Sequence, residues 1–275
     1  MRKIIILSFL FFISSFIQAQ TKEVWFPNGL NIRPFIANIL EPRAGVSYLI
    51  NQDKLRLDIG TSSDIYKIIS KNHILSFGAD IFTYTRLRSE NNFRFPVETI
   101  DYFFGLNCGY KIFNGSKQYG FRFRFSHISA HLVDGRFDKT SGEWRDSLQP
   151  FVYSREFFEM LPFYQINSLR FYAGMTYLFH VIPNSIGREI YQGGFDYYMN
   201  SFLSKNISPF IADDFKLTKI DKYSGNNIFM AGIKFGKYNG KGFSLIYSYI
   251  SGKSIQGELF NLNESYSSIG FNVDL

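Results

Sequence analysis

The sequence repeats one pattern, an alternation of apolar with polar or small residues, and this pattern limits the fold more than any other feature. In residues 168–180, for example, Phe171 and Met175 fall on one face while Arg170 and Thr176 fall on the other. Successive side chains of a β-strand point to opposite faces, so each such segment predicts a strand with one apolar face. No helical periodicity competes in these segments. We count twelve predicted strands, near residues 43–50, 54–66, 73–86, 99–113, 117–131, 150–164, 168–180, 188–200, 207–218, 225–237, 241–251 and 262–275.

The connections between the predicted strands alternate in length and chemistry. Asn114-Gly115 and Asn239-Gly240 are typical of tight hairpins, because Asn and Gly readily adopt positive φ angles. Longer polar stretches occupy residues 87–97, 132–149 and 252–258. Short turns at one end and long loops at the other are typical of a membrane barrel.

Two architectures are built from such strands: a soluble sandwich with its apolar faces inside, and a membrane barrel with its apolar faces in lipid. Aromatic residues make up 19% of the chain, with 32 Phe and 18 Tyr, and they crowd the apolar faces. The opposite faces carry charges that are very costly to bury in a sandwich but fit a polar lumen. These charges are Arg56, Asp58, Asp101, Lys111, Arg122, Arg124, Arg170, Asp196 and Lys234. The sequence therefore predicts an all-β fold, a transmembrane antiparallel β-barrel of about 12 strands over residues 43–275.

The chain ends in one more alternating segment. An open sheet edge in lipid leaves backbone groups without partners, so we expect this last segment to close the barrel against the first strand. The ending is similar to the C-terminal assembly signal of bacterial outer-membrane proteins. Gly270, Val273 and Leu275 match its glycine and apolar positions, and Phe271 belongs to the same predicted signal. The resemblance implies recognition by the outer-membrane assembly machinery.

Residues 1–19 predict a secretory signal peptide. Arg2 and Lys3 precede an apolar run, and Ala19 ends a plausible cleavage site. The run is shorter than the ~20 residues that a spanning helix needs, which disfavours a membrane anchor. We therefore expect cleavage, export and residence in the outer membrane of a Gram-negative bacterium. Residues 20–42 are then expected to form an N-terminal periplasmic segment or a plug at the barrel mouth.

The cysteine count and the charge exclude several other classes of protein. One cysteine, Cys108, cannot form an intrachain disulfide or a cysteine zinc cluster. The formal net charge of +7 is spread along the chain without a compact basic cluster. We therefore expect no nucleic-acid partner and expect outer-membrane lipid as the main contact.

One polar cluster stands out on a predicted apolar face, in residues 121–135. The parity of this strand places His127, Ser129 and His131 on the same outward face as the phenylalanines that precede them. In the same way, parity assigns His180 to the inward face of its own strand. Three interpretations of the cluster are open.

The first interpretation is a hydrolase. The His127-x-Ser129 spacing resembles outer-membrane phospholipase A, a family of twelve-stranded barrels with a histidine and a serine two apart on the outer wall. The resemblance implies that Ser129 is the nucleophile and His127 the general base. The third member of that family is an asparagine on the next strand, where this sequence offers Asp134 or Glu156 instead. We expect no cofactor, although the hydrolase interpretation admits a divalent cation.

The second interpretation is a metal site of His127, His131 and Asp134. Residues four apart on a strand lie about 13 Å apart, too far to share one zinc ion without a bend, so we assign no metal ligands. The third interpretation is a belt of interfacial side chains near the outer headgroups. Arg155 and Glu156 are adjacent and point to opposite faces, and near this rim they would border a polar rim patch with His131.

Over most of its length the chain resembles a family of bacterial outer-membrane barrels catalogued only as a domain of unknown function. The matching residues are Pro34-Phe35-Ile36-Ala37, Glu41-Pro42-Arg43, His127-x-Ser129-x-His131-Leu132-x-Asp134, Ser154-Arg155-Glu156 and Gly270. The family implies a fold and a location without an activity. We therefore predict first an outer-membrane barrel that is narrow or plugged, with a structural or transport-related role. The alternative is a lipid-acting hydrolase.

Overall fold

The computed structural model describes residues 21–199, 204, 206–220 and 222–274, so the predicted signal peptide and Leu275 lie outside the described residues. Within these ranges the chain is mostly β-structure. Its helical elements are three short 3-10 turns, at Asp134–Arg136, Arg145–Ser147 and Gly257–Leu259. No helix in the described ranges is long and apolar enough to cross a membrane.

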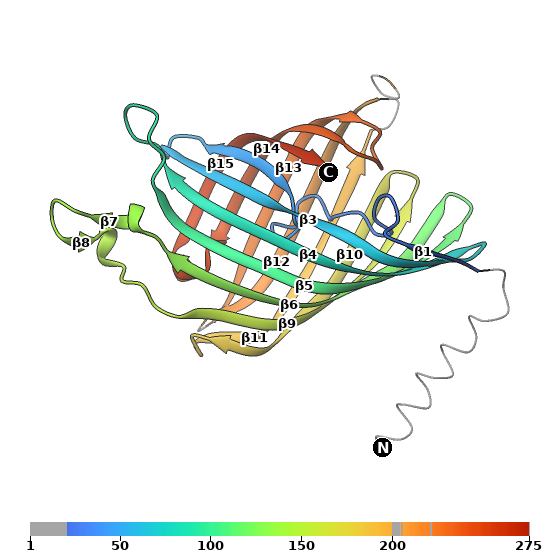
Figure 1. Ribbon diagram of the computed structural model, residues 1–275, viewed down its shortest axis with the longest axis horizontal. Helices are drawn as coiled ribbons and strands as arrows, with labels where there is room; N and C mark the ends of the chain where they lie inside the picture. Colours follow the sequence, from blue (N-terminus) through green and yellow to red (C-terminus); the bar gives the residue numbers. More distant parts are fainter. Residues whose placement is uncertain (1–20, 200–203, 205, 221, 275) are drawn as a thin grey trace, which may run out of the picture.

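Twelve strands form a closed antiparallel barrel, which confirms the predicted fold class (Figure 1). These strands are β2 (Ala44–Leu49), β3 (Lys54–Ile69), β4 (His73–Arg88), β5 (Val97–Asn114), β6 (Lys117–Leu132), β9 (Tyr153–Ile166), β10 (Leu169–Ile182), β11 (Ile186–Tyr198), β12 (Ile207–Ile220), β13 (Lys222–Gly236), β14 (Gly242–Lys253) and β15 (Asn263–Asp274). An extra strand, β1 (Lys22–Trp25), pairs with the far end of β3. β7 (Phe137–Asp138) and β8 (Glu143–Trp144) form a small separate hairpin.

The barrel closes where β15 pairs with β2. The register runs from Ser268 opposite Leu49 to Val273 opposite Ala44, so the last strand of the chain is the sealing strand. Gly270 sits at a close approach of the two backbones in this seam. A Cβ atom at that position would lie 2.2 Å from the backbone oxygen of Val46, which leaves room only for glycine.

The two ends of the barrel differ. We call the end that carries the C-terminus the turn end, and the opposite end the loop end. The connections at the turn end include the short links 70–72 and 115–116. The loop end carries the longest connection, residues 133–152.

The two faces of the wall separate as the alternation predicts. Large apolar side chains such as Phe104, Phe125 and Leu245 are exposed on the outer face. Charged side chains such as Arg124 and Asp196 are buried on the inner face. This distribution is typical of a barrel that faces lipid outside and encloses a polar interior.

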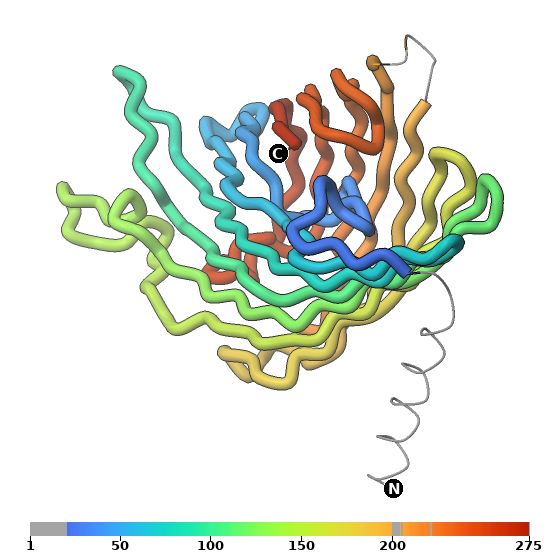
Figure 2. Tube along the Cα trace, turned by 45° about the vertical axis from the view of Figure 1, so that its right-hand side comes forward, coloured from blue at the N-terminus to red at the C-terminus, as the bar shows by residue number. Residues whose placement is uncertain are grey.

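Two segments fold into the barrel. Residues 26–43, which we call the plug, loop into the space between the strands near the turn end (Figure 2), and Glu41 within the plug is only 1% exposed. From the loop end, residues 254–260 also turn inward, and the backbone N–H of Gly257 donates to Oδ2 of Asp101 at 2.7 Å. The interior is therefore occupied from both ends.

Candidate functional site

The polar cluster of β6 lies on the outer face of the barrel, near the loop end. His127 and Ser129 are partly exposed there, while Ile128 between them is buried on the inner face. The ring of Phe104 packs beside the ring of His127, with 4.8 Å between the centroids. The imidazole is thus set into an otherwise apolar surface.

Glu156 of β9 lies opposite His127, because the β6–β9 register pairs these two residues. Nδ1 of His127 lies 2.6 Å from Oε1 of Glu156 and donates to it. Oγ of Ser154 donates to the same oxygen at 3.1 Å. A carboxylate bonded to Nδ1 fixes the orientation of the ring and leaves Nε2 to accept a proton.

Ser129 stands at the next outward position of the same strand. Cα atoms two residues apart on a strand lie about 6.6 Å apart and their side chains share a face, so the Ser129 hydroxyl can reach the free Nε2 of His127 by side-chain rotation. Across the register Ser129 lies opposite Ser154. The structure thus brings the imidazole of His127 and the carboxylate of Glu156 together, with the hydroxyl of Ser129 at the next outward position of the strand.

A second histidine reaches Glu156 from β10. Parity assigned His180 to the inward face, and this prediction is wrong because the β9–β10 register shifts between Leu178 and His180. A bulge adds one residue to the strand, so Phe179 and His180 are both exposed, and Nδ1 of His180 donates to Oε2 of Glu156. Bulges often re-aim a side chain next to a functional site. We call this group the outer-wall centre: His127, Ser129, Ser154, Glu156 and His180.

Other residues singled out in the sequence lie apart from this centre. Asp134 is exposed in the 3-10 turn that follows β6. His131 packs its ring against Tyr102, with 5.9 Å between centroids. Arg155 points to the inner side, with its guanidinium 5.8 Å from the ring centroid of Phe157. The wall therefore separates Arg155 from His131, and within the described ranges no group of three or more His, Cys, Asp or Glu side chains is arranged to hold a metal ion.

Three phenylalanines lie next to the outer-wall centre, one step toward the turn end. The ring of Phe158 lies 5.3 Å from that of Phe125 and 5.0 Å from that of Phe179, and the last two rings are 5.7 Å apart. All three are exposed on the outer face. We call Phe125, Phe158 and Phe179 the aromatic platform.

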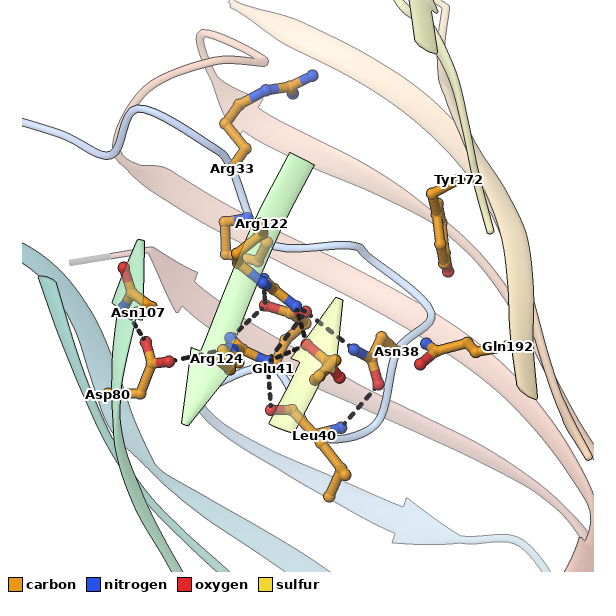
Figure 3. A network of polar contacts seen from close by, with 12 residues as sticks. Arg33, Asn38, Leu40, Glu41, Asp80, Asn107, Arg122, Arg124, Tyr172 and Gln192 are labelled. Carbon is orange, nitrogen blue, oxygen red and sulfur yellow. Dashed lines mark hydrogen bonds and ion pairs between the residues drawn. The ribbon is translucent and has the colours of Figure 1, made fainter. Parts of the chain in front are cut away.

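Inside the barrel, the plug is held by Glu41 (Figure 3). Nη1 and Nη2 of Arg122 donate to its two carboxylate oxygens at 2.8 and 2.6 Å, and Nη2 of Arg124 donates at 3.0 Å. Burial alone would raise the pKa of Glu41, but Arg122 and Arg124 together lower that pKa from 4.5 to about 2. The carboxylate therefore remains ionised although it is buried.

A second group of contacts holds the middle of the plug. The ring of Phe35 lies beneath the guanidinium of Arg170 at 4.3 Å from its centroid. Nη1 of Arg170 donates to the backbone oxygen of Arg33 at 2.8 Å. The backbone N–H of Ile36 donates to Oδ1 of Asp196 at 2.8 Å. Both strand-borne charges thus bond the plug backbone directly.

The fold and these two sites define the class: a twelve-stranded barrel of the outer-membrane type with an occupied interior. The chain belongs to the family described as "Protein of unknown function (DUF1207)", whose model matches residues 75–274. The predicted resemblance to a barrel family of unknown function is thereby confirmed. No curated protein matches the chain.

Solved structures give the same architecture. The outer membrane phospholipase A from Escherichia coli is similar with a TM-score of 0.56 and 11% identity, covering 89% of this chain and 94% of that one. The Salmonella typhi outer membrane phospholipase, in a dimer with bound calcium, is similar with a TM-score of 0.57 and 11% identity, covering 85% of this chain and 91% of that one. At this identity the likeness shows a shared fold.

Proposed function

We propose that this protein is an outer-membrane hydrolase that cleaves acyl esters of membrane lipids. Ser129 is the nucleophile, His127 the general base, and Glu156 the carboxylate that orients the base. The observation that carries the proposal is the 2.6 Å contact between Nδ1 of His127 and Oε1 of Glu156, with Ser129 at the next outward position. The sequence offered Asp134 or Glu156 as the third catalytic residue beside Ser129 and His127. We assign this role to Glu156.

The location of the centre determines which substrates can reach it. A polar side chain on the lipid-facing wall is costly unless it serves a purpose or lies near the headgroups. Ser129 lies near the loop end, so an ester at headgroup depth in the leaflet on that side would meet its hydroxyl. The aromatic platform extends from the centre toward the middle of the membrane, where it would support the acyl chain of the same lipid.

The reaction follows from these positions. Oγ of Ser129 attacks the carbonyl carbon of the ester, and its proton passes to Nε2 of His127. The bond to the alcohol then breaks, His127 returns the proton to the leaving alkoxide, and the acyl group stays on Ser129. A water that gives a proton to His127 then attacks this acyl-enzyme. As the bond to Ser129 breaks, His127 passes that proton to Oγ of Ser129, and the fatty acid leaves. Glu156 stays ionised and stabilises the imidazolium in both halves.

A divalent cation is a separate question. Among the described residues no group of three or more His, Cys, Asp or Glu side chains is arranged to hold a metal ion, and no step of the reaction is assigned to a metal. One phospholipase of similar fold has bound calcium in its structure. The assay below is therefore run both with Ca²⁺ and with a chelator.

A second role, transport through the lumen, is favoured by the plug. Residues 26–43 are held by side-chain contacts, such as the ion pairs of Glu41 and the hydrogen bonds of Arg170 and Asp196, rather than by strand pairing along their length. A segment bound in this way can leave without breaking the barrel. In its present position the plug makes conduction through the interior unfavourable.

The hydrolase proposal is tested by release of fatty acid from phospholipid by the protein refolded in mixed micelles. We expect Ser129→Ala and His127→Ala each to lower the rate by roughly 10³-fold or more, and Glu156→Gln to lower it severely as well. Ser126→Ala is the matched control, because Ser126 lies on the buried inner face of the same strand. Wild-type release no faster than that of Ser129→Ala, with and without Ca²⁺, would overturn the proposal.

A further inference from the structure

His180 is the ionisable member of the outer-wall centre to which the catalytic roles above assign no task. It comes from a third strand, β10, and reaches Glu156 only because the bulge after Leu178 turns it outward. Its partner is Oε2 of Glu156, whereas His127 and Ser154 use Oε1. One carboxylate therefore binds two imidazoles, one on each oxygen.

We propose that His127 and His180 share Glu156 as a coupled pair, and that the first proton to enter this pair as the pH falls resides on His180. The proposal rests on the proposed hydrolase function and adds a positioning residue to it. With the proton on His180, the ring of His127 stays neutral, and its Nε2 is free to act as the base for Ser129. His180 itself touches neither the substrate nor the reacting atoms.

The physical basis is the charge balance around one carboxylate. A single proton on either imidazole forms an ion pair with Glu156, and a second proton would place two positive rings beside one negative charge. Such groups titrate together, in two steps that belong to the pair. Between the two steps one histidine is charged and the other neutral, which is the state that a general base needs.

The neighbouring strands supply few other charges at this level of the wall. On β6 the next outward titratable group is His131, four residues from His127 and so about 13 Å away along the strand. On β9, Arg155 points to the other side of the wall. On β11, Arg188 and Glu189 are exposed, and the carboxylate of Glu189 accepts from the hydroxyl of Tyr191.

The coupling predicts a specific pH dependence. As the pH falls, the first proton entering the pair inactivates the wild-type centre only when it resides on His127. If His180 is replaced, every proton drawn in by Glu156 must reside on His127. The acidic limb of the rate profile should therefore move to higher pH.

The test compares two substitutions of His180 with a matched control. In His180→Gln the amide still donates to Glu156 but carries no proton, so the rate at alkaline pH should stay near wild type while the acidic limb shifts upward. In His180→Phe the hydrogen bond is also lost, so the alkaline rate should fall too. His131→Gln makes the same change on the same face without contact to Glu156, and its profile should match wild type. A His180→Gln profile identical to wild type would overturn the proposal.

A second measurement does not depend on catalysis. NMR titration of the histidine rings in Ser129→Ala, in micelles, should show His127 responding in two steps, which become a single step when His180→Gln is added. A single step in both proteins would overturn the shared pair whether or not lipid is hydrolysed. Two-step behaviour in a protein whose wild type hydrolyses no lipid would refute the proposed function and the task of His180 in it, but not the sharing of Glu156.

Discussion

Glu41→Gln should release the plug from the barrel wall. The substitution preserves the size of the side chain but removes the negative charge that Arg122 and Arg124 share, at 2.6 and 3.0 Å. Glutamine accepts through one oxygen and presents an NH2 group at its other end, so one guanidinium loses its hydrogen bond to residue 41. The plug then keeps its packing around Phe35 but loses its main electrostatic attachment.

Two observations give the size of the effect. The pKa of Glu41 is lowered from 4.5 to about 2, which at ~1.4 kcal/mol per pH unit corresponds to roughly 3–4 kcal/mol. Breaking a buried ion pair costs about 3–5 kcal/mol. Part of this cost is offset, since Arg122 keeps Glu159 at 3.0 Å and Arg124 keeps Asp80 at 2.9 Å. We therefore expect the plug to be less tightly held by about 2–3 kcal/mol.

Single-channel conductance in a planar lipid bilayer measures this change directly. Wild-type protein should be closed nearly all the time, and the open probability of Glu41→Gln should rise ~30- to 150-fold, as 1.4 kcal/mol corresponds to a factor of ten. Glu90→Gln is the control. It makes the same chemical change at an exposed ion pair with Arg88, where the expected effect is below about 1 kcal/mol.

An open probability of Glu41→Gln equal to that of Glu90→Gln would refute the reasoning. It would mean that the ion pairs of Glu41 do not hold the plug. Unchanged protection of the plug from added protease in the same variant would lead to the same conclusion.

Acid should loosen the plug in the unmodified protein as well. The folded pKa of Glu41 lies below its ordinary value, so its stabilisation is complete above pH 4.5 and is lost as the pH falls from 4.5 toward 2, which conductance at neutral and acid pH would detect. Gly270→Val should prevent closure, because a Cβ there meets the backbone oxygen of Val46 at 2.2 Å; heat-modifiable migration on a gel should disappear, and its persistence would contradict this. Phe158→Ala should raise KM for long-chain esters more than for short-chain esters and leave kcat nearly unchanged; equal effects on both would rule out the aromatic platform as the acyl-chain support.

The alternation of residues predicted the barrel because it is a local property. Residues 168–180, for example, were expected as a strand, and β10 spans Leu169–Ile182. The closing role of the last strand could be predicted equally well, because lipid offers no hydrogen-bond partner for the backbone of a strand edge. Both predictions need only the period of the alternation along the chain and the fact that lipid surrounds the strands.

The outward position of His180 could not be predicted from the sequence in the same way. A bulge adds one residue to one strand of a pair, and every side chain beyond it changes face. The available signal is weak: Leu178 is apolar on a face that is otherwise polar or small, so the alternation fails just before His180. A single break of this kind does not distinguish a bulge from an ordinary exception.

The contacts that attach the plug to the barrel wall could not be predicted from the alternation of residues either. Glu41 and Arg122 are 81 residues apart, and no periodicity links them. The aromatic residues of the predicted N-terminal segment lie in different surroundings in the structure. Phe35 is completely buried, whereas Trp25 and Phe26 are 67% and 74% exposed beside β3.

The most direct test of the outer-wall centre is covalent labelling of Ser129. A fluorophosphonate with a long alkyl chain reacts with a serine only when a neighbouring base activates it. Intact-mass and peptide analysis of the refolded protein should give one adduct, on Ser129, which is absent in Ser129→Ala and formed far more slowly in His127→Ala and Glu156→Gln. A wild-type protein that takes up no reagent, or an adduct that forms equally well in Ser129→Ala, would contradict the assignment of Ser129, His127 and Glu156 as a catalytic centre.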